Sequence, residues 1–248
     1  MGTVVAQYSG VMMALGLWYY NYKELRGRIT FKGSLQLIAM RRFFAVNRDI
    51  FLRTLCLIGV TTFFTSTGAR QGDVILAVNT LLMQLFTLLD GFAYAGEALS
   101  GRYVGACNLV QLKRAVKALF CWGVGLSLVF TLLYGIGGEN FLGLLTNDTV
   151  VIETAGRYFY WVLAIPLAGF AAFLWDGILI GATATRFMLW AMFVASGSFF
   201  VIYYCFSGAT NNHTLWLAFL VYLALRGIMQ TIWSRRVFTL KYLQSLRS

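Results

Sequence analysis

The sequence predicts an all-α, polytopic membrane helix bundle of about seven transmembrane helices. Of 248 residues, 59% are hydrophobic and only 12% are charged, whereas a soluble domain carries roughly 25% charged residues. The apolar residues are gathered in runs that are long enough to cross the hydrocarbon, which takes about 20 residues in a helix. Basic residues gather in alternate linkers between these runs. A backbone surrounded by lipid must satisfy its own hydrogen bonds, so the runs are expected to be helices.

Seven apolar runs mark the expected spans. They cover residues 3–22, 50–66, 74–100, 115–135, 158–180, 187–206 and 215–233. Residues 35–46 alternate between basic and apolar and are expected to form an amphipathic helix on the inner leaflet. Residues 140–151, which contain FLGLL, are expected to form a short helix at the outer interface.

The linkers alternate in charge, and this alternation predicts the topology. Sixteen basic residues lie in the first, third and fifth linkers and in the C-terminal tail, whereas the other linkers hold only Arg70 and Arg157. The positive-inside rule then places the N-terminus outside and the C-terminus in the cytosol. The membrane is expected to be the inner (plasma) membrane of the cell. The net charge of +11 is explained by topology and by contact with anionic membrane lipid, so no nucleic-acid partner is expected.

Four charged residues within the predicted spans qualify as candidates, because charge inside the membrane is costly and indicates function by default. They are Asp90, Glu97, Asp176 and Arg226. On the third span, two of these acids share one helical stripe with Asn79 and Tyr94, while leucines cover much of the remaining surface. This polar face is expected to look into protein or into a water-filled cavity.

The depths of these charges also agree. Counted from the nearest basic residue at the inner end of each span, Asp90, Asp176 and Arg226 lie twelve, ten and nine residues deep. At about 1.5 Å per residue these depths are about 18, 15 and 13 Å. Glu97 lies only about 7 Å deep and reaches towards the interface. The first three residues are therefore expected to meet in one layer.

Two interpretations of this layer stay open. Burial in an apolar bundle favours the neutral form of a carboxyl group, so the acids can form a site that binds a proton or another cation. Alternatively, Arg226 neutralises one aspartate permanently in a structural ion pair. Two carboxylates and one arginine leave one acid over, which favours the binding site.

Motifs of other chemistries are absent from the sequence. It contains no P-loop, no nucleophile elbow and no HExxH motif. The four cysteines are widely spaced, and His213 has no cysteine or histidine neighbour in the sequence. We therefore expect no enzyme activity, no metal site and no cofactor apart from a coupling ion.

Three stretches resemble the multidrug and toxic-compound extrusion (MATE) family, and most of all its DNA-damage-inducible F (DinF) branch. They are AVNRDIFLRTL at 45–55, LLDGFAYAGEALSGRYVGA at 88–106 and WDGILIGATATR at 175–186. That family has twelve helices in two lobes and exchanges amphipathic, often cationic drugs for H+ or Na+. The resemblance implies helix six at 1–22, a basic cytosolic linker at 23–49, a six-helix C-lobe at 50–236 and a basic cytosolic tail at 237–248.

The resemblance also assigns roles to residues. It implies a cation or proton site at Asp90 and Asp176, with Glu97 nearby, and a substrate cavity lined by Asn79, Tyr94 and Arg226. Nothing in the sequence matches helices one to five, whose first helix carries an aspartate central to proton coupling in one branch. A truncated or split gene product, with a separate N-lobe chain as partner, is therefore expected.

Two other functions remain as alternatives. A lipid-linked oligosaccharide flippase of the same superfamily is expected to have a more basic cavity, whereas the acids in this layer outnumber Arg226. A seven-helix receptor or rhodopsin matches the topology, but the last span contains no lysine for a retinal Schiff base and no NPxxY motif.

Overall fold

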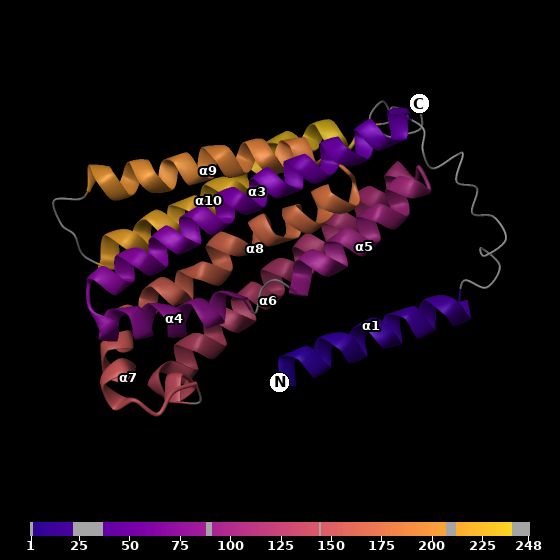
Figure 1. The fold of residues 1–248 in the computed structure, drawn as a ribbon. Coiled ribbons are helices and arrows are strands. Elements are labelled where there is room, and N and C mark those ends of the chain that lie inside the picture. Colours follow the sequence, from indigo (N-terminus) through magenta and orange to yellow (C-terminus); the bar gives the residue numbers. More distant parts are fainter. Residues whose placement is uncertain (1, 22–36, 88–90, 144, 207–211, 240–248) are drawn as a thin grey trace. The chain divides into compact units, whose positions relative to one another are not determined.

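The computed structural model describes residues 2–21, 37–87, 91–143, 145–206 and 212–239 of the chain. Within these ranges the secondary structure is helical and no strand occurs, which confirms the predicted all-α class. The helices are α1 (Gly2–Asn21), α3 (Leu37–Arg70), α4 (Asp73–Thr87), α5 (Gly91–Gly105), α6 (Leu109–Gly143), α7 (Thr149–Gly156), α8 (Phe159–Gly181), α9 (Thr185–Cys205) and α10 (Asn212–Val237) (Figure 1).

Five helices in the described part of the chain are long and apolar enough to cross a membrane, judged by length and composition. These spans are Phe43–Arg70, Leu109–Gly138, Phe159–Gly181, Thr185–Cys205 and Asn212–Arg236. They coincide with five of the predicted runs, so the chain is a multi-pass membrane protein. The run predicted at 3–22 forms α1. The run predicted at 74–100 is divided into α4 and α5, on either side of residues 88–90, which lie outside the described ranges.

The chain falls into two compact units, Met1–Ala45 and Val46–Ser248. The amphipathic helix predicted at 35–46 is not a separate element, because α3 runs without a break from Leu37 to Arg70. Residues 22–36, which carry much of the predicted basic linker, lie outside the described part.

The short helix predicted at 140–151 begins later than expected. The backbone of α6 leaves helical geometry at Gly138, where φ is +44°, a conformation that glycine adopts without a Cβ clash. The last turn of α6 follows this break, and α7 starts only at Thr149. Asp148 fixes that start, because its side chain accepts hydrogen bonds from the backbone N–H groups of Val150 and Val151.

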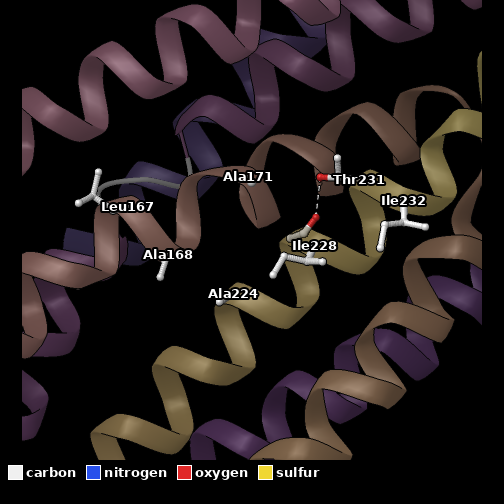
Figure 2. Close-up of a pocket in the computed structure, with 8 residues that line it drawn as sticks. Leu167, Ala168, Ala171, Ala224, Ile228, Thr231 and Ile232 are labelled. Atoms are coloured by element: carbon white, nitrogen blue, oxygen red, sulfur yellow. Dashed lines mark hydrogen bonds between the residues drawn. The ribbon is translucent and has the colours of Figure 1, made fainter.

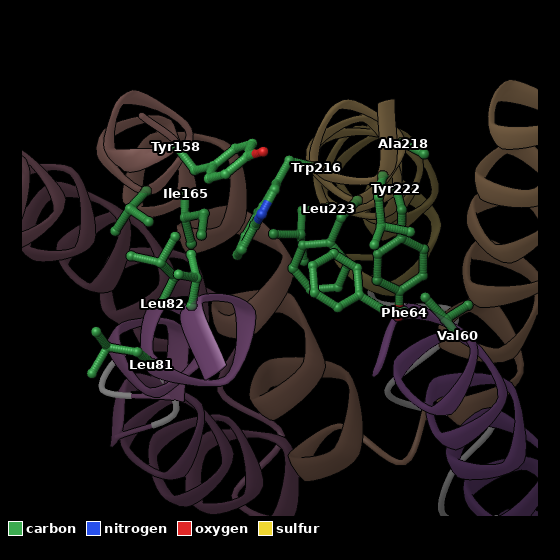
Figure 3. Close-up of a cluster of buried hydrophobic side chains, with 14 of the residues drawn as sticks. Val60, Phe64, Leu81, Leu82, Tyr158, Ile165, Trp216, Ala218, Tyr222 and Leu223 are labelled. Carbon is green, nitrogen blue, oxygen red and sulfur yellow. The ribbon is translucent and has the colours of Figure 1, made fainter. Parts of the chain in front are cut away.

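Helix α8 is the central helix of the unit Val46–Ser248. It packs against α5, α6 and α10, and α10 packs in turn against α9. A large apolar cluster joins α3, α4, α8 and α10, and Figure 3 shows Phe64, Leu82, Ile165 and Trp216 pointing towards one another within it. Association of helices in lipid depends on packing of this kind rather than on the expulsion of water.

The contact between α5 and α8 depends on two glycines. A Cβ atom at Gly177 would overlap the backbone carbonyl of Ala93, and one at Gly181 would overlap the carbonyl oxygen of Glu97 and the Ser100 hydroxyl. The spacing of these glycines on α8 predicts close packing, and the structure confirms it. Backbone atoms of α5 therefore lie directly against α8 at the level of Asp176.

The first prediction concerns this contact. Gly177→Ala should lower the free energy of unfolding by about 3 kcal/mol or more, because the backbone of Ala93 cannot rotate away as a side chain can. The measurement is thermal or denaturant unfolding of the purified chain in detergent. Gly125→Ala on α6 is the matched control, since no atom lies within 4 Å of the added Cβ there. Equal stability of the two variants would contradict the close contact.

Candidate functional site

A cavity of about 290 Å³ lies between α3, α5, α8 and α10. Its charged and hydroxyl-bearing lining residues are Arg53, Tyr94, Glu97, Asp176 and Arg226. Apolar and small residues complete the wall, namely Leu57, Ala93, Phe173, Gly177 and Ile180. Of the six predicted site residues, four are thus brought together around one space: Tyr94, Glu97, Asp176 and Arg226.

Asp176 is the most constrained acid of the cavity. Its residue is only 3% exposed. One carboxylate oxygen, Oδ2, forms an ion pair with Arg53 and lies 3.5 Å from Nη2 of Arg226. The other oxygen, Oδ1, accepts a hydrogen bond of 2.6 Å from Nε2 of Gln230. A buried charge needs such partners, because desolvation costs several kcal/mol (about 20 kcal/mol in the idealised limit) unless it is paired and hydrogen-bonded.

Arg226 is as deeply buried as its partner, at 1% exposure. Its Nη1 donates a hydrogen bond of 3.3 Å to the Tyr222 hydroxyl, which donates in turn to the sulfur of Met192. The guanidinium carbon lies 5.4 Å from the ring centre of Phe173 and 5.6 Å from that of Tyr222. Aromatic faces attract a cation at this range. The protein thus stabilises this buried guanidinium on several sides.

Arg53 and Gln230 complete the network, and neither is among the site residues predicted from the sequence. Arg53 lies on α3, five residues beyond Arg48 at the basic inner end of the span, so helical depth could have placed it near the layer. Gln230 lies four residues after Arg226 on α10, and residues at this spacing share a helix face. The rotation of α3 about its own axis, which turns Arg53 towards α8, could not be predicted from the sequence.

Glu97 and Tyr94 line the same cavity from α5 but are exposed. Glu97 forms no ion pair with any residue in the described ranges. The described lining residues include two arginines, Arg53 and Arg226, and two acids, Asp176 and Glu97. Their charges cancel when both acids are ionised. Arg53 is thus a second arginine at this cavity, whereas the sequence predicts only Arg226 there.

Asn79 does not line this cavity. It is buried on α4 and exchanges two hydrogen bonds, of 2.8 and 2.9 Å, with the side-chain amide of Asn212 at the start of α10. Its carbonyl oxygen also accepts a bond of 3.0 Å from the indole N–H of Trp216. These bonds join α4 to α10 in the large apolar cluster. Asp90, the remaining predicted site residue, lies outside the described ranges.

Asp49 lies apart from Asp176 at the start of the membrane span of α3. Its buried carboxylate pairs with Arg48 at 3.0 Å and accepts a hydrogen bond of 3.3 Å from the Thr185 hydroxyl at the first residue of α9. The positive end of a helix dipole favours a carboxylate in this position. Asp49 therefore joins α3 to α9 and is not a lining residue of the charged cavity.

A second hollow, between α8 and α10, differs in chemistry. Figure 2 shows its lining of small and aliphatic side chains, including Ala168, Ala171 and Ala224. The single hydroxyl in its lining, on Thr231, donates to the Gly227 carbonyl and accepts from the indole N–H of Trp175. Every polar group there is engaged, so the charged cavity is the stronger candidate for binding chemistry.

A multi-pass helix bundle with a charged cavity among its spans has the architecture of a membrane transporter. The MatE family profile matches residues 50–205. DNA damage-inducible protein F of Escherichia coli (strain K12) is 37% identical over 246 residues, which cover 95% of this chain and 52% of that protein. Protein DETOXIFICATION 45, chloroplastic, of Arabidopsis thaliana is 23% identical over 192 residues, 74% of this chain and 34% of that protein.

The chain therefore belongs to the MatE family of membrane transporters. The resemblance drawn from AVNRDIFLRTL and the two other stretches is confirmed. The chain spans about half the length of the E. coli protein that it matches.

The second prediction concerns the charge network. Asp176→Asn should lower the free energy of unfolding by about 3–5 kcal/mol, because Arg53 and Arg226 lose their shared counterion. Arg53→Gln in the same molecule should recover about 1–3 kcal/mol of this loss, since it removes one of the two orphaned charges. Detergent unfolding of the two single variants and the double variant gives the coupling energy.

Glu153→Gln, which removes an exposed carboxylate from α7, is the matched control and should leave stability within about 0.5 kcal/mol. Strictly additive effects of the two single substitutions would contradict the pairing of Arg53 with Asp176.

Proposed function

We propose that this chain is the C-terminal lobe of a cation-coupled multidrug efflux antiporter. The observation that carries the proposal is the cavity in which Asp176, Arg226, Glu97 and Tyr94 meet inside a member of the MatE family. The aromatic ring of Tyr94 and the exposed carboxylate of Glu97 favour amphipathic, cationic small molecules. The coupling ion is H+ or Na+.

The two acids of the cavity then have different tasks. Asp176 is tied to two arginines and Gln230, so a proton or cation can load it only by displacing Arg53 or Arg226. Glu97 is exposed to the cavity without an ion pair in the described part of the chain. We assign the first contact with the cation to Glu97 and the coupling step, in which an arginine is released, to Asp176. Asp90 stays in the proposal as the other acid of the predicted layer.

The remaining parts of the transporter are also proposals. The resemblance aligns this chain with helices six to twelve, so transport requires the other lobe, supplied in the same polypeptide or by a separate N-lobe chain. The membrane is the inner (plasma) membrane, with the N-terminus outside and the C-terminus in the cytosol, because the basic linkers alternate.

A lipid-linked oligosaccharide flippase is the second candidate function. The observation that favours it is Arg53, which gives the cavity two guanidinium groups where the sequence predicts one. Guanidinium groups bind phosphate in bidentate geometry. Transport assays with cationic dyes and with lipid-linked sugars separate the two functions, and we place the cationic drug first because Asp176 already engages both arginines.

The third prediction concerns transport by the full-length transporter that contains this lobe. Glu97→Gln should reduce efflux of a cationic dye by about tenfold without a change in expression, because the cavity loses its exposed carboxylate. Asp90→Asn and Asp176→Asn should abolish drug resistance. The measurement is dye efflux from loaded cells, with Glu153→Gln as the control. Wild-type efflux by all three variants, at equal expression, would overturn the assigned roles.

The fourth prediction concerns topology. Reporter fusions at Lys113, in a basic linker, and at Glu139, after the next span, should report opposite compartments, with Lys113 in the cytosol. Fusions of alkaline phosphatase and of a fluorescent protein at each position give the measurement. Placement of both sites in one compartment would contradict the predicted membrane topology. The predicted depth of the acid layer depends on that topology.

A further inference from the structure

We propose that a groove between the basic ends of α9 and α10 binds one anionic phospholipid. The groove has a volume of about 680 Å³ and is lined by Arg186, Phe187, Trp190, Val194, Trp233 and Arg236. It is separate from the charged cavity, with which it shares no lining residue. Lipid binding in the groove therefore does not depend on the proposed transport function.

The lining residues form a gradient from charge to apolar surface. Arg186 lies in the first turn of α9 and Arg236 near the end of α10, so the two guanidinium groups come from the same end of this antiparallel pair. Trp190 and Val194 follow Arg186 at four and eight residues, on the same face of α9. This face extends about 12 Å from the arginine to the valine. A headgroup at the arginines would leave its acyl chains along Trp190 and Val194.

The charge of the groove selects an anion. Both arginines are exposed, and neither forms an ion pair with any residue in the described ranges. None of the described residues that line the groove is an acid. Asp49, which touches the neighbouring Thr185, is already bound to Arg48 and that hydroxyl. Guanidinium groups match phosphate in bidentate geometry, whereas cationic drugs are repelled by this pair.

The apolar wall selects a lipid rather than a free anion. Trp190 is 52% exposed and packs its ring against Phe193, and Val194 is 41% exposed. Tryptophan is enriched at the level of the lipid headgroups, and basic pockets between helices at the cytosolic side bind anionic headgroups. The groove thus offers a phosphate contact and an acyl contact to one molecule, in the leaflet where the topology places the basic linkers.

Native mass spectrometry of the purified chain tests this site. The chain in detergent is titrated with phosphatidylglycerol or with phosphatidylcholine of the same acyl chains. The expected result is one tightly retained phosphatidylglycerol and no retained phosphatidylcholine. The Arg186→Gln/Arg236→Gln variant should bind phosphatidylglycerol about 25-fold more weakly, since each basic residue contributes a factor of about five. Arg186→Lys/Arg236→Lys should keep most of the affinity, because the charges remain.

Lys113→Gln/Lys117→Gln is the matched control, since it removes two exposed charges from the start of α6 and should leave binding unchanged. Circular dichroism checks that all variants retain their helical content. Equal retention of the two lipids, or wild-type affinity of the Arg186→Gln/Arg236→Gln variant, would overturn the proposal. Displacement of the lipid by inorganic phosphate would also overturn it, by assigning the groove to a free anion.

Discussion

The ion pairs of Asp176 with two arginines are the interaction around which the membrane part of this chain is organised. A carboxylate inside an apolar bundle is stable only where cations and donors replace the water that it has lost. Arg53 on α3, Arg226 on α10 and Gln230 one turn further on α10 provide these contacts. Two helices that are distant in the sequence, α3 and α10, are thereby held to one side chain of α8.

The geometry of this network follows from the packing of α8 against α5. The residue after Asp176 is Gly177, and the missing side chain there lets the backbone of α5 approach at this level. Tyr94 and Glu97 lie on the turns of α5 next to that contact and therefore reach the same cavity. One glycine thus determines both the distance between two helices and the composition of the site.

Much of this arrangement could be predicted from the sequence, because lipid restricts which structures a chain can form. The scarcity of charge predicts the fold class, and helical depth predicts that Asp176 and Arg226 meet. The contribution of Arg53 could not be predicted in the same way, since it depends on how α3 is rotated about its own axis. Asn79 shows the same limit: it shares a sequence stripe with Tyr94, yet α4 turns it towards Asn212. Periodicity assigns a residue to a face but does not say which helix that face meets.

The central claim is that a water-accessible cavity reaches Asp176 between α5 and α8, and thiol accessibility tests it most directly. In a cysteine-free background, Tyr94→Cys would be compared with Trp122→Cys, an equally exposed position on α6 that does not line the cavity. The account predicts that a charged, membrane-impermeant thiol reagent modifies the cysteine at position 94 quickly and the one at 122 slowly, since only the former meets water. Equal, slow modification of both cysteines would place Tyr94 against lipid and contradict the cavity.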